Sequence, residues 1–431
     1  MLRTLINTMQ SFSRFFTHEF IAQLGKKNKT LSQKALVLAP YLPPNTSGGV
    51  YRPLSWMKHA QKCDLSLEFI TKKYSKSQTD AGVYLSNQIN DDVVIHEILP
   101  FTGQVSFKFS FRVDGDFNGA IKALEVALNI YKKNPPSVIV ATGPSFDYFV
   151  TGFYLSKILG VPLILDYRDE WTENPFSFVT LGNSDRFWEK RCLHHANAVI
   201  FTTESMRQHQ VDKFKLTHKK TFVVANGWEE NEHTNEILST NTNNSEDLTL
   251  LFCGTLGEAT PPDDFLTDIY QVKNKYNTEK FNFQIKFVGQ QSKLALGQIG
   301  KSLIKDLVSV EGMLPRNKAN YLMSQAGALL LFTNYDMKRY IPGKLFDYLN
   351  AGRKIIVHGE YGEAAKLVEE LDAGYFVAKG DVVTLKVVLD KVKKTEMNDE
   401  EIKRRKIQLA KYSRKNLASD FFAIINSVAK S

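Results

Sequence analysis

Along the chain, short apolar runs alternate with segments in which apolar residues recur every three or four positions. A short apolar run is typical of a strand buried in a parallel sheet, and the longer period is typical of a helix packed against one. From Lys34 onward this alternation predicts a doubly wound α/β fold. The strands expected in the first half of the chain are 35–39, 65–70, 93–99, 138–141, 163–166, 198–202 and 221–225, with helices such as 118–132 and 146–159 between them.

A polar tract at 229–247, rich in Asn, Thr and Glu, interrupts the alternation and predicts a linker or surface insertion. A second series of strands follows at 248–253, 283–288, 307–310, 328–332, 354–357 and 374–377. The chain is therefore expected to form two Rossmann-like domains, at 34–228 and 248–398, with C-terminal helices at 399–431 that cross back to the first domain. Parallel sheets bind ligands beyond the carboxyl ends of their strands, so a ligand is expected in a central cleft between the domains.

Residues 1–33 precede the first strand, and their apolar residues recur at helical spacing. The positions concerned are Leu2, Leu5, Ile6, Met9, Phe12, Phe16, Phe20 and Leu24. This pattern predicts an amphipathic helical extension. Such a helix lies either on an anionic membrane or on the protein's own surface, and the sequence leaves both readings open.

The composition favours a globular protein of several domains over a membrane-spanning or disulfide-rich one. A chain of 431 residues, of which 43% are hydrophobic, is long enough for two or three packed domains. No apolar run reaches the roughly 20 residues that a membrane-spanning helix needs. The three cysteines, Cys63, Cys192 and Cys253, are scattered, which favours a reducing compartment over a disulfide framework or a zinc site. A cytoplasmic location is expected. The sequence leaves open whether the protein also binds the inner face of the cell membrane.

The net charge of +9 suits nucleic acid, anionic lipid or a phosphorylated substrate. Since the sequence contains no recognisable nucleic-acid-binding module, nucleic acid is not expected as a partner.

Two glycine-bearing loops follow the first predicted strand of each half. Gly48 and Gly49 stand before a predicted helix, where backbone N–H groups can approach an anion closely. Gly254 opens the second half in the same way, and Thr255 adds a hydroxyl. The sequence here is neither a P-loop nor a GxGxxG fingerprint, so each glycine loop alone is a weak signal.

A third loop follows the predicted strand 163–166 and is dense in charge. It contains Asp166, Arg168, Asp169 and Trp171. Charged residues at the carboxyl end of a parallel strand favour a binding site over an ordinary solvated loop.

The fourth loop lies in the stretch 340–354, directly after an apolar strand. Pro342 and Gly343 stand where a helix is expected to begin, and Lys344 and Asp347 project from one side of its first turns. A helix start suits a phosphate, Lys344 adds a positive charge, and Asp347 has the reach to accept two ribose hydroxyls. We interpret this stretch as half of a nucleotide-sugar site.

In their order and spacing, eight segments resemble the GT-B glycosyltransferases of family four, particularly the bacterial branch that assembles polysaccharides and O-antigen. The segments span most of residues 34–431 and read SGGVYRP (47–53), LDYRDEW (165–171), WEKRCLHHANAVIFTTESM (188–206), VVANGW (223–228), LFCGTLG (251–257), VEGMLPRNKANYLMSQAGALLLF (310–332), IPGKLFDYLNAGRKII (341–356) and YSRKNLASDFFAII (412–425). The resemblance implies a metal-independent, retaining transferase without a resident cofactor. It would move a hexose or N-acetylhexosamine from a nucleotide-diphosphate sugar, with a UDP-sugar favoured, to a glycan or lipid-linked acceptor in surface polysaccharide or capsule biosynthesis.

The same resemblance implies roles for individual positions. On the donor side the positions are Gly48, Gly49, Gly254, Thr255, Met313, Gly343, Lys344 and Asp347. Among them, Lys344 is expected to hold the diphosphate, Met313 to lie beside the base and Asp347 to bind the ribose. The positions expected on the acceptor side are Arg52, Asp166, Arg168, Asp169 and Trp171, and Asn226 is expected at the hinge. The expected catalytic residues are Lys344, Arg168 and Asp169.

The chain departs from the family pattern at Arg339 and Asp347, and the basic residues that often follow the phosphate loop are missing in GTLGEATPP (254–262). Arg339 stands where relatives carry a glutamate that contacts the sugar, and Asp347 stands where they place a glutamate on the ribose. These departures leave two alternatives open. One is a GT-B relative that binds a nucleotide sugar or glycan as a non-catalytic partner subunit, and the other is a nucleotide-sugar epimerase of the same fold.

Two short motifs contain residue types that bind metal ions, but neither predicts a metal site in this chain. Asp114-Gly115-Asp116 has the form of the manganese-binding triplet of GT-A glycosyltransferases, but it precedes a helical pattern, where an aspartate is ordinary as a cap. His194 and His195 are adjacent, and neighbouring side chains on a helix point in different directions. No metal is expected.

Overall fold

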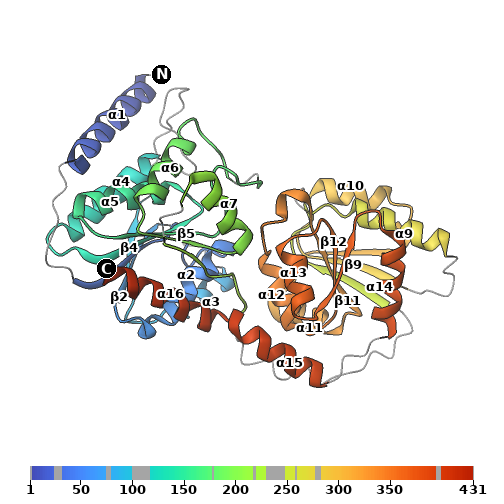
Figure 1. Cartoon of the computed structure of the whole chain (residues 1–431). Coiled ribbons are helices and arrows are strands. Elements are labelled where there is room, and N and C mark those ends of the chain that lie inside the picture. The colour runs from blue at the N-terminus through green and yellow to red at the C-terminus, as the bar shows by residue number, and fades with distance from the viewer. Residues whose placement is uncertain are drawn as a thin grey trace. The chain divides into compact units, whose positions relative to one another are not determined.

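The computed structural model describes residues 2–23, 32–73, 79–99, 117–176, 179–216, 220–229, 248–257, 260–276, 283–394 and 399–430. The triplet at Asp114-Gly115-Asp116 and positions 230–247 of the predicted polar tract lie outside these residues. The chain divides into two compact units, Met1–Ala225 with Arg414–Ser431, and Asn226–Ser413. Each unit is a parallel sheet covered by helices (Figure 1).

The sheet of unit 1 has seven parallel strands in the order β3-β2-β1-β4-β5-β6-β7. Their bounds are β1 Ser32–Leu38, β2 Ser66–Lys72, β3 Val94–Ile98, β4 Pro136–Gly143, β5 Leu163–Tyr167, β6 Ala198–Phe201 and β7 Lys220–Val223. The neighbours β1 and β4 run in register, with Ala35 beside Val138 and Leu38 beside Ala141. Every strand predicted in this half is present. Helices cover both faces, so neither face of the central strands has to be polar, and this is why they read as unbroken apolar runs.

The helices of unit 1 are α1 Leu2–Gln23, α2 Tyr51–Lys58, α3 Asp80–Ser86, α4 Phe117–Tyr131, α5 Asp147–Leu159, α6 Asp185–His195, α7 Glu204–Phe214 and α16 Arg414–Ala429. Local sequence explains several of their ends. Helix α7 begins after Thr203, whose hydroxyl accepts a hydrogen bond from the Met206 amide. Helix α5 ends at Gly160, which adopts a left-handed conformation with φ 68°.

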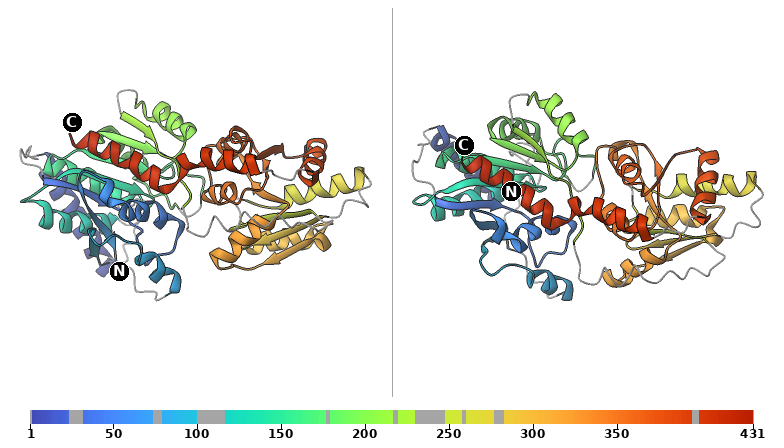
Figure 2. Two further views of the ribbon diagram at one scale, coloured as in Figure 1. Left: turned by 90° about the horizontal axis from the view of Figure 1, so that it is seen from below. Right: turned by 60° about the horizontal axis from the view of Figure 1, so that its bottom comes forward.

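The C-terminal helix α16 packs against α2 and β4 and completes one side of unit 1 (Figure 2). Phe421 is fully buried, and its ring stacks on Trp56 of α2 with 3.9 Å between the ring centroids. Alternate side chains of the central strands, such as Val37 and Val140, belong to the same cluster. The predicted C-terminal helical segment is therefore split, because α15 (Asp399–Leu409) belongs to unit 2 and α16 to unit 1.

We expect Phe421→Ala to destabilise unit 1 by about 3–5 kcal/mol, the usual cost of removing a large aromatic side chain from a packed core. Phe20→Ala is the control, because the Phe20 side chain is 62% exposed, and it should change stability by less than about 0.5 kcal/mol. Urea unfolding followed by far-UV circular dichroism measures both. Equal losses in the two variants would contradict the packing of α16 described above.

Unit 2 repeats the architecture with six parallel strands in the order β10-β9-β8-β11-β12-β13. The strands are β8 Leu248–Cys253, β9 Phe283–Val288, β10 Val308–Glu311, β11 Ala328–Phe332, β12 Ile355–Gly359 and β13 Gly374–Ala378. The helices are α9 Asp263–Lys275, α10 Lys293–Lys301, α11 Arg316–Gln325, α12 Gly343–Asn350, α13 Glu363–Glu370, α14 Val382–Lys394 and α15. All six predicted strands are present, so the predicted class of two doubly wound parallel-sheet domains is confirmed.

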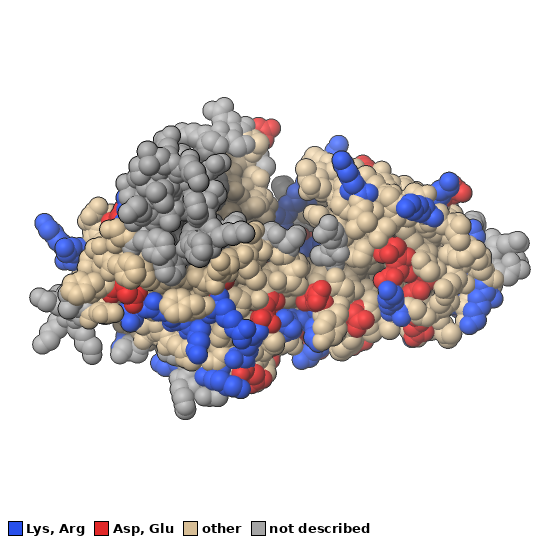
Figure 3. All heavy atoms as spheres, turned by 90° about the horizontal axis from the view of Figure 1, so that it is seen from above, with Lys and Arg blue, Asp and Glu red and all other residues tan. Residues whose placement is uncertain are grey.

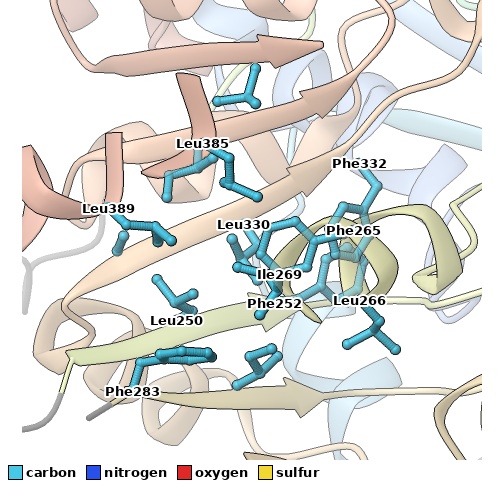
Figure 4. Packing of buried hydrophobic residues seen from close by; sticks show 14 of the residues in the cluster. Leu250, Phe252, Phe265, Leu266, Ile269, Phe283, Leu330, Phe332, Leu385 and Leu389 are labelled. Carbon is cyan, nitrogen blue, oxygen red and sulfur yellow. The ribbon is translucent and has the colours of Figure 1, made fainter. Parts of the chain in front are cut away.

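One face of this second sheet packs against α9 and α14 through large apolar side chains (Figure 4). Phe252 of β8 stacks on Phe332 of β11 with 5.2 Å between centroids, and Phe265 of α9 lies against the same ring. The stack fixes β8 beside β11, and the loops that follow these two strands build the site described below.

Figure 3 shows lysine and arginine side chains interspersed with acidic ones over the visible face of each unit, with no single band of one sign. Among the described residues, no helix is both long and apolar enough to cross a membrane.

Candidate functional site

Both sheets reverse their strand order at one point, between β1 and β4 in unit 1 and between β8 and β11 in unit 2. Ligands of open parallel sheets bind beyond the carboxyl ends of the strands at such a reversal, because the loops on either side diverge there. The two glycine loops predicted from sequence follow β1 and β8, so each lies at the reversal point of its own sheet.

In unit 2 the loop after β8 is held close to its neighbour by two glycines. Gly254 has φ +139°, and its amide donates to the Val288 carbonyl at 2.8 Å. Gly289, the residue after β9, has φ +126°, and a Cβ there would lie 2.3 Å from the Gly254 carbonyl oxygen. Both conformations favour glycine, and a side chain at 289 would collide with the loop. Gly254 was predicted from sequence, whereas Gly289 was not.

Lys344 lies at the start of α12, whose first residue follows Pro342 in an extended conformation. Its ammonium donates to the Thr255 carbonyl at 3.3 Å and lies 4.1 Å from the centroid of the Phe252 ring. A Cβ on Gly254 would approach the Lys344 Nζ to 3.0 Å, so the lysine packs on the glycine loop. Within the described part of the chain, no carboxylate lies at ion-pair distance from Lys344.

Burial lowers the pKa of Lys344 to about 8. Loss of hydration disfavours the charged form of an amine, and the neutral partners of this ammonium do little to offset that loss. An anion placed beside Lys344 would therefore gain a partner whose charge is not already neutralised. The first amides of α12 point in the same direction as the positive end of the helix dipole, which also favours an anion.

Tyr348 joins α12 to the glycine loop. Its buried hydroxyl accepts from the Cys253 amide at 2.7 Å and donates to the Cys253 carbonyl at 2.9 Å. Tyr348 comes one helical turn after Lys344, so this double hydrogen bond fixes the lysine relative to Gly254. The sequence analysis missed this residue. The signal available was its i+4 spacing from Lys344 on the same helix face.

Four further residues predicted on the donor side, Asp347, Gly343, Thr255 and Met313, belong to unit 2, whereas Gly48 and Gly49 belong to unit 1. Asp347 is 41% exposed and pairs with Arg316 of α11 at 3.2 Å. Gly343 and Thr255 are exposed, and Met313, in the loop between β10 and α11, is 79% exposed. Arg316 was not predicted, because its 31-residue separation from Asp347 hides the pairing in the sequence.

In unit 1 the Arg168 guanidinium connects three loops through backbone carbonyls. Its Nε donates to Gly143 at 2.8 Å, its Nη2 donates to Pro144 at 2.5 Å and its Nη1 donates to Gly49. The side chain is buried, which lowers the pKa of Arg168 from its usual value. A Cβ at position 49 would lie 3.0 Å from the Nη1 atom, so glycine leaves the guanidinium room for this close approach. Arg168 therefore positions the predicted glycine loop, while Gly48 beside it faces open space.

Asp169 follows Arg168 at the carboxyl end of β5. Burial raises the pKa of its carboxyl group to about 6, and the neighbouring Arg168 only partly offsets this rise. A carboxyl group with a pKa near neutrality can exchange a proton under ordinary conditions. Among the residues predicted on the acceptor side, Asp169 is the one whose chemistry fits a direct role.

The remaining acceptor-side predictions, Arg52, Asp166 and Trp171, lie inside unit 1. Arg52 donates to the two carboxylate oxygens of Asp166 at 2.7 and 3.1 Å, and Asp166 is fully buried. The Trp171 ring is also fully buried, and its indole donates to Asp185 at 2.6 Å. The sequence analysis expected all three on the acceptor side, and in the structure their polar groups bond within unit 1: Arg52 of α2 joins β5 to the segment after β7, and Trp171 bonds to the start of α6.

No protein-family model matches the chain, and no curated protein sequence matches it. Many solved structures do. Sucrose-phosphate synthase from Thermosynechococcus elongatus has a TM-score of 0.64 at 13% identity over 93% of this chain and 100% of that one. The lipopolysaccharide outer core galactosyltransferase WaaB has a TM-score of 0.62 at 12% identity, covering 91% of this chain and 99% of that one.

A third similar structure is HepE from Anabaena in complex with UDP and glucose, with a TM-score of 0.60 at 14% identity over 91% of this chain and 99% of that one. These neighbours are GT-B glycosyltransferases that match over nearly their whole length. At such low identity the likeness establishes the fold, and the chain has the GT-B fold.

Proposed function

We propose that this protein is a retaining, metal-independent glycosyltransferase. It takes a hexose or N-acetylhexosamine from a nucleotide-diphosphate sugar and builds a surface polysaccharide on a glycan or lipid-linked acceptor. The observation that carries the proposal is the Lys344 ammonium, which lies at the start of α12 against Gly254 and has neutral contacts within the described residues. Such a group suits a diphosphate.

The similar structures support a UDP-sugar as the donor. HepE was solved with UDP and glucose, and WaaB is named a galactosyltransferase. In this proposal unit 2 holds the donor, with its ribose hydroxyls on Asp347 and its base beside Met313. The carboxylate of Asp347 already faces a cation, Arg316, which would orient it toward two hydroxyls.

The chemistry proposed for the chain is electrostatic. When the bond from the sugar to the diphosphate breaks, negative charge grows on the leaving phosphate oxygen. Lys344 and the first amides of α12 would stabilise that charge without having to reorganise, since Tyr348 holds the helix in place. Asp169 would contact the acceptor or the transferred sugar, and Arg168 would position the loop of Gly48 and Gly49.

The test of the donor site is ligand-observed NMR with UDP, GDP, ADP and CMP, each added without metal to the folded protein. The expected result is binding of one diphosphate nucleotide, UDP in the first instance, and its loss in Lys344→Ala. If none of the four nucleotides binds, or if Lys344→Ala binds as well as the unaltered protein, the donor site is wrongly placed.

Arg339 favours a second candidate function, a partner subunit that binds a nucleotide sugar or glycan without transferring it. The acidic group that relatives use on the sugar is absent at this position. The two functions differ in turnover, because a binding subunit releases no nucleotide diphosphate when donor and acceptor are both supplied. A same-fold epimerase would differ again by converting the donor sugar without any acceptor.

Donor binding is expected to weaken as the pH rises through about 8. Lys344 binds an anion only when protonated, and burial has lowered its pKa to about 8. The neighbouring Cys253 thiol has a raised pKa and stays neutral over this range, and a diphosphate is already ionised above about pH 7. Calorimetric titration with UDP at several pH values measures the effect. Lys344→Arg, whose guanidinium stays protonated, should bind with a nearly flat profile, and an equal decline in both proteins would exclude Lys344 as the cause.

A further inference from the structure

A pocket of about 330 Å³ lies in unit 2 between α9 and α10. Asp263 and Tyr270 of α9 and Gln298 of α10 form part of its wall. Figure 1 shows both helices on the side of the second sheet away from α11 and α12. Because Lys344 belongs to α12, the pocket is separate from the proposed donor site. Its volume is at the lower end of the range for small-molecule sites, about 300–1,000 Å³.

Two polar atoms in the wall of this pocket have no hydrogen-bond donor within the described residues. They are Oδ1 of Asp263 and Oε1 of Gln298, and both are covered from solvent. A buried acceptor without a donor costs free energy, so such atoms are rare in folded proteins. The two oxygens belong to side chains from different helices that line one pocket. A molecule with hydrogen-bond donors in the pocket would satisfy both.

The charges of the pocket favour a neutral molecule over an ion. Among the described residues that line the pocket, the charged ones are Asp263 and Lys301, one of each sign. Asp263 is the first residue of α9, where the positive end of the helix dipole stabilises a carboxylate. The pair leaves no net charge to attract an ion, and the two acceptors without donors disfavour an anion. Neutral hydroxyl groups supply the missing donors without either conflict.

Apolar side chains form the rest of the wall that the argument needs. Leu266 is buried, whereas Leu303 is 73% exposed at the edge of the pocket. Tyr270 is partly buried and packs against the core of unit 2, which holds its ring in place. Apolar and aromatic surface beside a few polar groups is the usual composition of a small-molecule site. A sugar ring matches it, with hydroxyl groups around its edge and C–H groups on its faces.

We propose that the pocket between α9 and α10 binds a neutral sugar. Its hydroxyl groups donate to Asp263 and Gln298, and the C–H face of its ring lies against Tyr270. Rotation of the two acceptor side chains about their terminal bonds turns the covered oxygens toward the sugar. The sugar is held by these contacts alone, and no bond is made or broken. In a protein that builds a glycan, such a site would keep the chain attached at a second point.

Sugar binding in this pocket does not depend on the proposed transfer reaction. It is measured without a nucleotide, and Lys344→Ala should leave it unchanged. Failure of the donor-site test therefore leaves this proposal standing, and failure of this proposal leaves the donor site untouched.

The experiment is saturation-transfer NMR of the full-length protein with the methyl glycosides of glucose, galactose and N-acetylglucosamine. The expected result is binding of at least one of the three. Gln298→Leu should weaken this binding about three- to tenfold, the effect of one neutral hydrogen bond. Asp263→Ala should weaken it about tenfold or more, since a hydrogen bond to a charged acceptor is stronger.

Thermal melting separates this role of Gln298 from a structural one. Gln298→Leu removes an acceptor that has no donor, so the variant should melt at the same temperature as the unaltered protein or above it. The matched control is Gln284→Leu, the same replacement at an exposed residue of β9 in the same unit. The control should change neither sugar binding nor the melting temperature.

Three results would overturn the proposal. The first is that none of the three glycosides binds to the folded protein. The second is that Gln298→Leu and Asp263→Ala bind as well as the unaltered protein, which would place the sugar elsewhere. The third is that Gln298→Leu lowers the melting temperature together with binding, which would give Gln298 a structural role.

Discussion

Replacing Lys344 by alanine is expected to lower kcat/KM for sugar transfer by about 10²- to 10³-fold, which corresponds to roughly 3–4 kcal/mol of lost transition-state stabilisation. The expectation follows from the position of the ammonium. It lies against Phe252 and Gly254 at the start of α12, and none of its contacts within the described residues neutralises it. Removal of the side chain would leave the helix amides as the remaining anion-binding groups at this point.

The measurement is release of nucleotide diphosphate in the presence of donor and acceptor, at saturating and limiting donor. Lys366→Ala is the matched control. It removes one positive charge from the same unit, at a side chain that is 55% exposed and pairs with Glu370. The control should keep the rate of the unaltered protein. If Lys366→Ala loses as much activity as Lys344→Ala, the effect is one of overall charge and not of the site.

Replacing Arg52 by alanine is expected to destabilise unit 1 by about 3–5 kcal/mol. Arg52 binds both oxygens of Asp166, which is fully buried, and Thr142 donates to the same carboxylate at 2.7 Å. The guanidinium also donates to the carbonyls of Val224 and Ala225, at 2.9 Å each. Without Arg52, the buried Asp166 carboxylate keeps one hydroxyl donor, and the Val224 and Ala225 carbonyls each lose a hydrogen bond.

Urea unfolding followed by tryptophan fluorescence measures this loss, because Trp56, Trp171 and Trp188 all lie in unit 1. Arg207→Ala breaks an exposed pair with Glu204 and should cost less than about 1 kcal/mol. The double variant Arg52→Met/Asp166→Leu removes both charges together and should be more stable than Arg52→Ala alone. Equal stability of Arg52→Ala and Arg207→Ala would mean that the buried pair contributes no more than a surface one.

The two sheets could be predicted because their strands are buried on both faces. A strand such as β11, with the sequence ALLLF, is an unbroken apolar run and can therefore be recognised as a buried segment. Its short length and the Pro-Gly pair that follows it distinguish it from a helix. The helix start at Gly343 was readable for the same local reason. The split of the C-terminal helices was not, because the 3-10 turn at Ala410–Tyr412 carries no proline or glycine.

The site residues were predicted less completely, since their roles depend on partners far along the chain. Arg168 was identified as a charged residue after a strand, but its binding to the Gly49 carbonyl joins residues 119 positions apart. Arg52 and Ala225 are separated by 173 positions. A strand's carboxyl end locates a polar residue in the fold without saying whether it faces a ligand or a backbone carbonyl. Only the assembled loops distinguish the two.

The packing of α16 also has a consequence for synthesis of the chain. Trp56 and the strand side chains beside it come before unit 2 in the sequence, whereas Phe421 comes after unit 2. During translation, this apolar face of the first sheet stays uncovered until all of unit 2 has been synthesised. Exposed apolar surface in a nascent chain invites chaperone binding and aggregation. A stop codon a few residues before Arg414 would remove α16 and would leave this face of unit 1 permanently uncovered.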